Sequence, residues 1–290
     1  MDLKNKLAVL TYFDIFNFPL TEFELQKWQF QKDFLPTVEV EKNIQQHNGF
    51  YFLKNRSEII QTRLTRYSIA EKKFKKVIKI SKVLRWIPFI KMIAVCNSLS
   101  YSNATVESDI DLFIITQKNR IWLTRFLAVS WLKIFKLRPR ENDTQDKICL
   151  SFFVSEDSLN LEKLLLPAKN NLSDIHFIYW LSQFKMIYDK DRTWIKFTQA
   201  NEWLKKYLPN FEWAQSNLRR QIKTIKLPSF WGGWLEKIVR KYQLKILPVT
   251  IKDKMNQNSN VVVNDQILKL HTNDRREEYR DKFKNKIFQK

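Results

Sequence analysis

One stretch of the chain, residues 93–116 with the sequence IAVCNSLSYSNATVESDIDLFIIT, limits the fold more than any other. It reads as a buried strand over residues 92–96, a polar loop, and a second buried strand that opens with Asp109 and Asp111. Side chains at positions i and i+2 of a strand point to the same face. We therefore expect both carboxylates to project together as a ledge for a divalent metal ion, while the apolar residues between and beyond them cover the opposite face.

Composition narrows the class of protein. The 290 residues suffice for about two domains, and 44% hydrophobic content is ample for real cores. With 3 glycines, the chain contains neither G-x-G-x-x-G nor G-x-x-x-x-G-K-[S/T], which argues against dinucleotide-type and P-loop phosphate sites. The net charge of +21 favours a polyanionic partner, most naturally nucleic acid or a nucleotide, although a lysine-rich solvated surface would account for part of it.

Cysteine usage and the start of the chain favour a cytoplasmic protein with no membrane partner. Cys96 and Cys149 both lie in apolar runs, and two thiols are too few for a disulfide framework or a zinc site. The first residues lack a small-residue cleavage site, so we expect no signal peptide. Residues 121–137 are the most apolar segment, but basic residues interrupt them and they fall short of the roughly 20 clean residues that span a bilayer. We expect a buried amphipathic helix there.

Residues 1–62 begin with two predicted helices. Apolar residues recur at helical spacing over residues 3–16. A second helix is expected to start near Glu22, because Thr21 and Glu24 have the identity and spacing of a capping box.

A third helix and a hairpin would complete a winged-helix-like module. The helix is expected from residue 36 to Gly49, where glycine allows a left-handed stop, and the hairpin from residues 50–53 and 58–60. In a winged helix the third helix would read DNA. Here it carries two glutamates against a single lysine, and acidic residues repel phosphate, so a protein-interaction or packing role is favoured over DNA binding.

Residues 63–87 are expected to form one long connecting helix before Pro88. A solvated basic face on this helix is favoured over a nucleic-acid-binding tract. Its basic cluster consists of Lys72, Lys73, Lys75, Lys76, Lys79 and Lys82.

Residues 88–165 are expected to form an α/β core with a small mixed sheet. A third strand at residues 147–154 follows the apolar helix, which completes the order strand, strand, helix, strand. Residues 166–290 return to helical periodicity, with a short extended segment at 261–263 and a last helix over about 273–288. The sequence thus predicts an α/β (α+β) protein with a mainly helical C-terminal region.

The central stretch resembles the signature of the polymerase β-type nucleotidyltransferase superfamily. That signature is a Gly-Ser pair at the end of one strand, a loop of about ten residues, and D-x-D on the next strand. Here Asn97 and Ser98 stand at the Gly-Ser position, ten residues separate Ser98 from Asp109, and residues 108–112 read SDIDL. The order of the three regions is also similar to that of uncharacterised bacterial nucleotidyltransferase-domain proteins.

The resemblance implies a fold, an activity and a set of site residues. It implies an enzyme that moves an NMP from a nucleoside triphosphate to an acceptor, with Mg²⁺ or Mn²⁺ held by Asp109 and Asp111. It also implies that Asn97, Ser98 and Ser108 lie near the phosphates. Two ions between paired carboxylates would stabilise the attacking and leaving oxygens of an in-line displacement.

The chain departs from this pattern in two places that bear on activity. Asn97 replaces glycine; asparagine is the non-glycine residue that best tolerates positive φ, so the turn can form, but its side chain crowds the approach of phosphate. The third carboxylate that the family usually places on a later strand is missing, because Ser151 occupies the expected inward position. Metal binding is expected to be weaker as a result.

The segment HTNDRR, residues 271–276, leaves two interpretations open. Arg275 and Arg276 could clamp a triphosphate, with His271 or Asp274 assisting. Alternatively, Asn273 could cap the last helix and both arginines could be solvated, which is the favoured interpretation.

The main alternative to catalysis is a degenerate nucleotidyltransferase fold that acts as a nucleic-acid- or protein-binding adaptor or regulator. A weaker alternative is an antitoxin-like partner of another small protein. The sequence does not indicate an oligomeric state.

Overall fold

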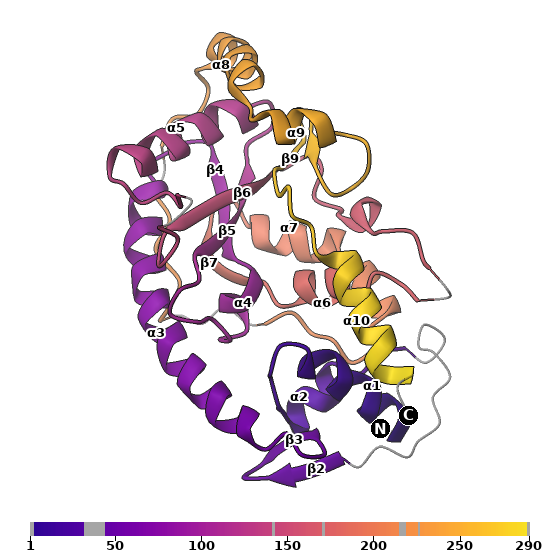
Figure 1. The fold of residues 1–290 in the computed structure, drawn as a ribbon. Coiled ribbons are helices and arrows are strands. Elements are labelled where there is room, and N and C mark those ends of the chain that lie inside the picture. The colour runs from indigo at the N-terminus through magenta and orange to yellow at the C-terminus, as the bar shows by residue number, and fades with distance from the viewer. Residues whose placement is uncertain are drawn as a thin grey trace.

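The protein is a mixed α+β chain built around a central sheet (Figure 1). The sheet has six strands in the order β7-β4-β5-β6-β9-β8, and a second sheet of three strands lies near the N-terminal helices. The computed structural model describes residues 3–31, 44–140, 143–169, 172–214, 219–225 and 227–288.

The middle of the central sheet follows the predicted order. β4 (Ile90–Val95) pairs antiparallel with β5 (Ile110–Thr116), and β5 pairs parallel with β6 (Ile148–Ser155). Parallel neighbours need a crossover connection, which α5 (Ile121–Ile134) supplies. The predicted order of strand, strand, helix, strand is confirmed.

Each face of β5 packs into a different hydrophobic core. Ile110, Leu112 and Ile114 lie in the core that α3, α5, α8 and α9 cover, whereas Phe113 and Ile115 face the core covered by α1, α6, α7 and α10. Because side chains alternate along a strand, Asp111 projects to the second face. The expected separation of acidic and apolar faces is confirmed at Asp111.

The central sheet extends beyond residue 165. β7 (Lys185–Asp189) pairs with β4, and β9 (Ile267–Lys269) pairs with β6. The extended segment predicted near residue 262 is the edge strand β8 (Val262–Val263). The expectation of a mainly helical C-terminal region overlooked β7 and β9, because strands this short show no clear period-two pattern.

Helices cover both faces of the sheet (Figure 1). Among the residues that the structure describes, no helix combines the length and apolar character needed to cross a bilayer. The C-terminal region contains the short 3₁₀ turns Glu162–Leu164 and Glu202–Lys206 and the helices α6 (Ile175–Ser182), α7 (Thr193–Ala200), α8 (Gly233–Ile246), α9 (Val249–Lys254) and α10 (Arg276–Phe288).

The N-terminal region begins with α1 (Leu3–Asp14) and α2 (Glu22–Lys27). The predicted capping box of α2 is present: the Thr21 hydroxyl accepts a hydrogen bond from the Glu24 amide at 3.3 Å. The Glu24 carboxylate in turn accepts one from the Thr21 amide at 2.9 Å. These two bonds satisfy amides that the first turn of a helix leaves without partners.

The predicted hairpin is shifted along the chain. β2 (Ile44–His47) pairs with β3 (Phe50–Leu53) across Asn48 and Gly49, whose φ values are 50° and 79°. Asn-Gly is the preferred pair for a two-residue hairpin turn, so Gly49 turns a hairpin instead of ending a helix. The short strand β1 (Leu20–Thr21) completes this sheet.

Two further parts of the predicted winged-helix-like module are the second strand of its hairpin and its third helix. Residues 58–60, predicted as the second strand of the hairpin, are the first turn of α3 (Glu58–Leu84). The predicted third helix lies mostly within residues 32–43, which are outside the described part of the chain.

α3 carries one lysine that is not on a solvated face. Lys73 is 3% exposed, and its ammonium donates to the carbonyls of Val106 and Ser108 and to the Asp146 carboxylate, at 3.1, 2.7 and 2.7 Å. It therefore ties α3 to the loop that precedes the paired aspartates. The interpretation of the whole cluster as a solvated face is wrong for this residue.

We expect Lys73→Met to lower the free energy of unfolding by about 2–3 kcal/mol, because it removes the buried ammonium that donates to two carbonyls and a carboxylate while keeping most of the apolar stem. Urea unfolding followed by circular dichroism measures this. Lys72→Met, at the exposed neighbouring position, is the matched control and should change stability by less than about 0.5 kcal/mol. Equal effects of the two variants would contradict the assigned role of Lys73.

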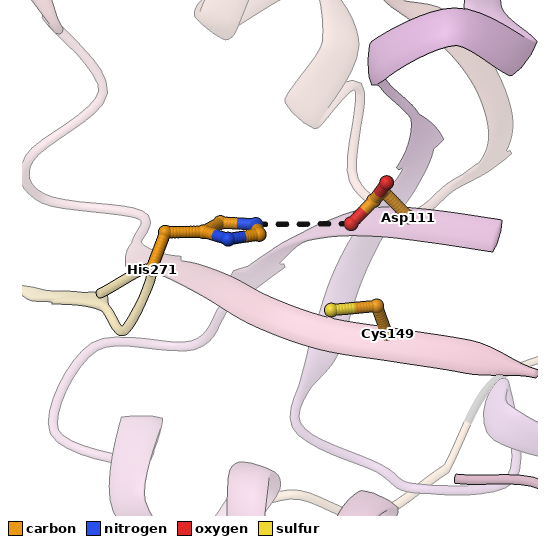
Figure 2. A group of neighbouring side chains, drawn as sticks. All are labelled: Asp111, Cys149 and His271. Carbon is orange, nitrogen blue, oxygen red and sulfur yellow. Dashed lines mark ion pairs between the residues drawn. The ribbon is translucent and has the colours of Figure 1, made fainter. Parts of the chain in front are cut away.

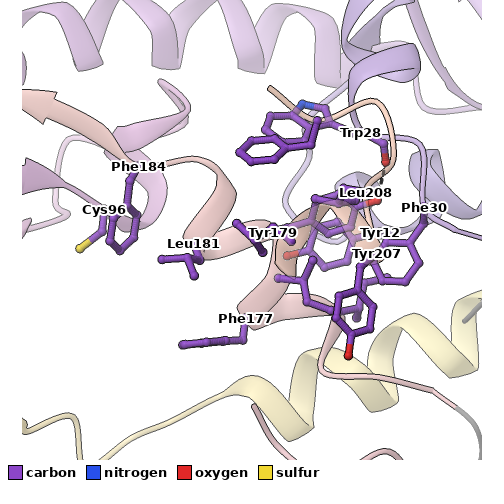
Figure 3. Close-up of a cluster of buried hydrophobic side chains, with 14 of the residues drawn as sticks. Tyr12, Trp28, Phe30, Cys96, Phe177, Tyr179, Leu181, Phe184, Tyr207 and Leu208 are labelled. Atoms are coloured by element: carbon purple, nitrogen blue, oxygen red, sulfur yellow. Dashed lines mark hydrogen bonds between the residues drawn. The ribbon is translucent and has the colours of Figure 1, made fainter. Parts of the chain in front are cut away.

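Aromatic side chains join the N-terminal helices to the core (Figure 3). The rings of Tyr12 in α1 and Tyr179 in α6 stack with centroids 4.4 Å apart, and the Tyr179 hydroxyl donates to the Trp28 carbonyl at 2.8 Å. α10 packs against both α1 and α6, so the two ends of the described chain meet over one face of the sheet (Figure 1).

Candidate functional site

A cavity of about 320 Å³ lies on the face of the sheet to which Asp111 projects. Its walls come from α1, the β4–β5 connection, β5, β6, α6 and the segment from β9 into α10. Cavities of this size are typical of sites for small molecules. Segments far apart in sequence thus enclose one space.

The cavity gathers most of the residues that the sequence singled out. Those lining it are Asn97, Ser98, Asp111, Ser151, His271, Asp274, Arg275 and Arg276. Ser108 and Asp109 do not line it: the Ser108 hydroxyl donates to the Thr105 carbonyl at 3.0 Å, and Asp109 immediately precedes β5. The inward position predicted for Ser151 is confirmed.

Asp111 is a buried carboxylate of the site. It is 8% exposed, and its Oδ1 has no hydrogen-bond partner among the described residues. His271 Nε2 lies 3.7 Å from this oxygen, and Cys149 Sγ lies within 4.8 Å of both groups. Figure 2 shows these side chains converging from β5, β6 and the segment after β9.

The electrostatics of the site follow from burial and from two neighbouring carboxylates. Burial, and then the charge of Asp111, raise the pKa of Asp109 to about 6. The Asp111 carboxylate raises the pKa of His271. Burial, together with both carboxylates, raises the pKa of the Cys149 thiol. This concentration of negative charge favours a bound cation.

Asn97 adopts the conformation that its identity allows. Its φ is 55°, in the left-handed region, as expected for asparagine in place of glycine. The indole of Trp180 donates to the Asn97 Oδ1 at 2.5 Å. The side chain is therefore held against the aromatic wall of the cavity.

One wall of the cavity is aromatic. Phe152 and Trp180 stack with centroids 5.7 Å apart and planes 11° from parallel, and the rings of His176 and Tyr279 lie 4.4 Å apart. Burial lowers the pKa of His176 to about 3, so this imidazole is neutral. Its Nδ1 lies 3.0 Å from the Tyr12 hydroxyl. These aromatic rings and the neutral imidazole make this wall uncharged.

Arg276 is the centre of a buried ionic network. It is 4% exposed, and its guanidinium bonds to Asp274 at 2.9 Å, to Asp174 at 2.9 Å and to the Leu164 carbonyl at 2.7 Å. Lys269 in β9 shares Asp274 at 2.5 Å. The network therefore fixes the start of α10 to α6 and to the central sheet.

The favoured interpretation of residues 271–276 needs correction. Asp274, and not Asn273, accepts the hydrogen bond from the Arg276 amide at the start of α10, at 3.0 Å. Arg276 is buried, whereas Arg275 is exposed, pairs with Glu278 at 2.7 Å and lies over the Tyr279 ring. Of the two arginines, Arg275 is the better placed to meet a ligand.

Sequence reasoning missed Cys149 and Lys269 as parts of the site. A signal for Cys149 existed: it stands two residues before Ser151 in the same strand, so both side chains face the same way. Cys149 is also the direct neighbour of Asp111 in the β5–β6 register. No local pattern indicates Lys269, although its partner Asp274 lies only five residues further along the chain.

The fold and site define the protein as a mixed α+β protein with a carboxylate-lined and aromatic-lined cavity. A scan against protein-family models matched none, and neither a curated protein nor a solved structure matched the chain.

Proposed function

We propose that the protein is a nucleotidyltransferase that binds a nucleoside triphosphate in this cavity and transfers its NMP to an acceptor hydroxyl, with pyrophosphate as the leaving group. One observation carries the proposal: the cavity joins the 97–98 turn and Asp111 to aromatic side chains from β6, α6 and α10. These are the parts that phosphate, metal and base each require. Of the two aspartates in the D-x-D, Asp111 lines this cavity and Asp109 precedes it in the chain.

The two ends of the cavity differ in chemistry. The base would lie against Trp180 and Phe152, and the phosphates would extend toward Ser98 and the turn at Asn97. Arg275, at the rim, can reach phosphate oxygens if its bond to Glu278 opens. This assignment orients the triphosphate with its charged end toward Asp111.

The donors at Asp111 fit a divalent cation. A buried carboxylate oxygen without a hydrogen-bond partner is costly, and a second carboxylate nearby increases the need for positive charge. Asp109 and Asp111 would hold Mg²⁺ or Mn²⁺, which when bound supplies charge compensation to the triphosphate. Ser98 would position the phosphates, and the aromatic wall would exclude water from the base.

The proposal is tested by label transfer. The full-length protein is incubated with each α-labelled nucleoside triphosphate, Mg²⁺ or Mn²⁺, and RNA, DNA or protein acceptors. We expect acceptor labelling that the Asp109→Asn/Asp111→Asn double variant does not support. Labelling no greater than that of the double variant, across all combinations, would reject the activity.

A second candidate is favoured by the side chains of β6. Cys149 and Ser151 face the site where a third carboxylate is expected, so the cavity could hold a nucleotide without turnover and the protein could act as an adaptor or regulator. This candidate predicts nucleotide binding by calorimetry with no label transfer. Nucleic-acid binding through the basic surface would in addition weaken steeply with salt.

A further inference from the structure

The cluster of Asp111, Cys149 and His271 contains donors that the D-x-D pattern does not include. Each side chain offers one ligand atom, and the oxygen, sulfur and nitrogen atoms all lie within 4.8 Å of one another. Asp111 and Cys149 are paired neighbours on β5 and β6, and His271 follows β9 (Figure 2). Three separate segments of the chain therefore supply one donor each.

Two of these donors, His271 and Asp111, form a long ion pair (Figure 2). The 3.7 Å between His271 Nε2 and Asp111 Oδ1 is too long for a good hydrogen bond, and within the described part of the chain this buried oxygen has no hydrogen-bond partner. A buried carboxylate oxygen that has a long ion pair but no hydrogen bond among the described residues calls for an explanation, and a bound ion is one. A cation between the three atoms would satisfy all of them.

The segment that carries His271 is held in place. Lys269 and Asp274, on either side of it, are joined by a bond of 2.5 Å, and Asp274 is also held by Arg276. The His271 side chain itself is 41% exposed and lines the cavity. A ligand on an anchored segment with an open side is the arrangement that a site for an exchangeable ion requires.

We propose that this cluster binds a transition-metal ion of the Zn²⁺ class, with Asp111, Cys149 and His271 as its protein ligands and one coordination position open to the cavity. Thiolate and imidazole select Zn²⁺ and related ions, whereas Mg²⁺ takes oxygen ligands. Three protein ligands with an open position are typical of catalytic zinc sites. The count of two cysteines argued against zinc, but one thiol suffices once the fold adds a carboxylate and an imidazole.

The inference adds a second ion site that shares Asp111 with the Mg²⁺ or Mn²⁺ of the proposed transfer, and it therefore rests on the proposed function. Metal binding is measured without nucleotide or acceptor, so the two proposals fail separately. Transfer with Mg²⁺ but no thiolate-bound metal would reject the zinc-class site alone. A thiolate-bound metal with no transfer under any metal would reject the transfer alone.

The test is titration of the metal-free, full-length protein with Co²⁺, a spectroscopic substitute for Zn²⁺. We expect one Co²⁺ per chain, with intense visible bands of four-coordinate Co²⁺ and a near-ultraviolet thiolate-to-metal charge-transfer band. Zn²⁺ should displace the Co²⁺ stoichiometrically, and a large excess of Mg²⁺ should not. Absence of the charge-transfer band, or displacement by Mg²⁺, would overturn the proposal.

Variants identify the ligands. The charge-transfer band should disappear in Cys149→Ser and persist in Cys96→Ala, which removes the other of the two thiols; the reverse result would overturn the assignment. If Cys149→Ser does not fold, His271→Asn at a partly exposed side chain replaces it. We expect that variant to keep its unfolding midpoint and to lose about tenfold or more in Co²⁺ affinity. Unchanged affinity would exclude His271 as a ligand.

Discussion

Asp111→Asn is expected to reduce nucleotidyl transfer about a thousandfold, the upper range for loss of one electrostatic contact to the reacting groups. The same change is expected to leave the protein as stable as before, or more stable by up to about 1 kcal/mol. The reason is that the native carboxylate is 8% exposed and has an oxygen without a hydrogen-bond partner among the described residues, beside a second carboxylate. Label transfer and urea unfolding on the same preparation measure both effects.

The combination of the two effects separates a functional role from a structural one. If Asp111 had a structural role, its substitution would lower the free energy of unfolding of the protein. A residue retained for function instead reduces stability in the native protein, so its substitution does not destabilise the fold. Glu107→Gln makes the same chemical change at an exposed site in the preceding loop and should alter neither quantity. Loss of transfer accompanied by an equal loss of folded protein would contradict the assignment of Asp111.

Arg276→Met is expected to lower the free energy of unfolding by about 3–5 kcal/mol, the range for breaking a buried ion pair. The guanidinium bonds to Asp174, which is 1% exposed, and to Asp274. Methionine fills part of the volume but leaves these carboxylates with too little positive charge. Thermal and urea unfolding followed by circular dichroism measure the loss.

The adjacent arginine is the matched control for this prediction. Arg275→Met removes the same side chain from an exposed position, where ion pairs contribute about 0–1 kcal/mol. Adding Asp174→Asn to Arg276→Met should restore part of the stability, because it removes the unpaired buried charge. If the two methionine variants are equally stable, the network is not the anchor of α10.

Local patterns predicted the parts of the fold that depend on neighbours in sequence. The capping box of Thr21 and Glu24, the alternation along β5 and the positive φ of Asn97 all follow from backbone geometry over a few residues. The Asn-Gly turn at residues 48–49 was equally visible, but its helical interpretation misplaced the hairpin. Short-range rules were therefore sufficient wherever they were read correctly.

Sequence patterns did not predict the burial of polar residues. Lys73 and Arg276 look like solvated basic residues in sequence, and each is buried because carboxylates and carbonyls distant in the chain surround it. β7 and β9 were missed because a short strand is stabilised by the partner that it joins and carries little pattern of its own. Burial and pairing of this kind depend on long-range contacts.

Residues 93–116 show which features of the site follow from the sequence and which depend on the tertiary structure. Residues 93–116 alone predict two adjacent strands, a turn that asparagine can make, and a carboxylate directed away from the apolar face, because strand geometry repeats every two residues. Only the packing of the whole chain brings Asp111 next to Cys149 and His271. The same packing places α1 and α10 along the cavity. The chemistry of the site depends on which distant donors reach Asp111. Pairing of β6 with β5 brings Cys149 there, and the ionic network at Arg276 holds the segment that carries His271.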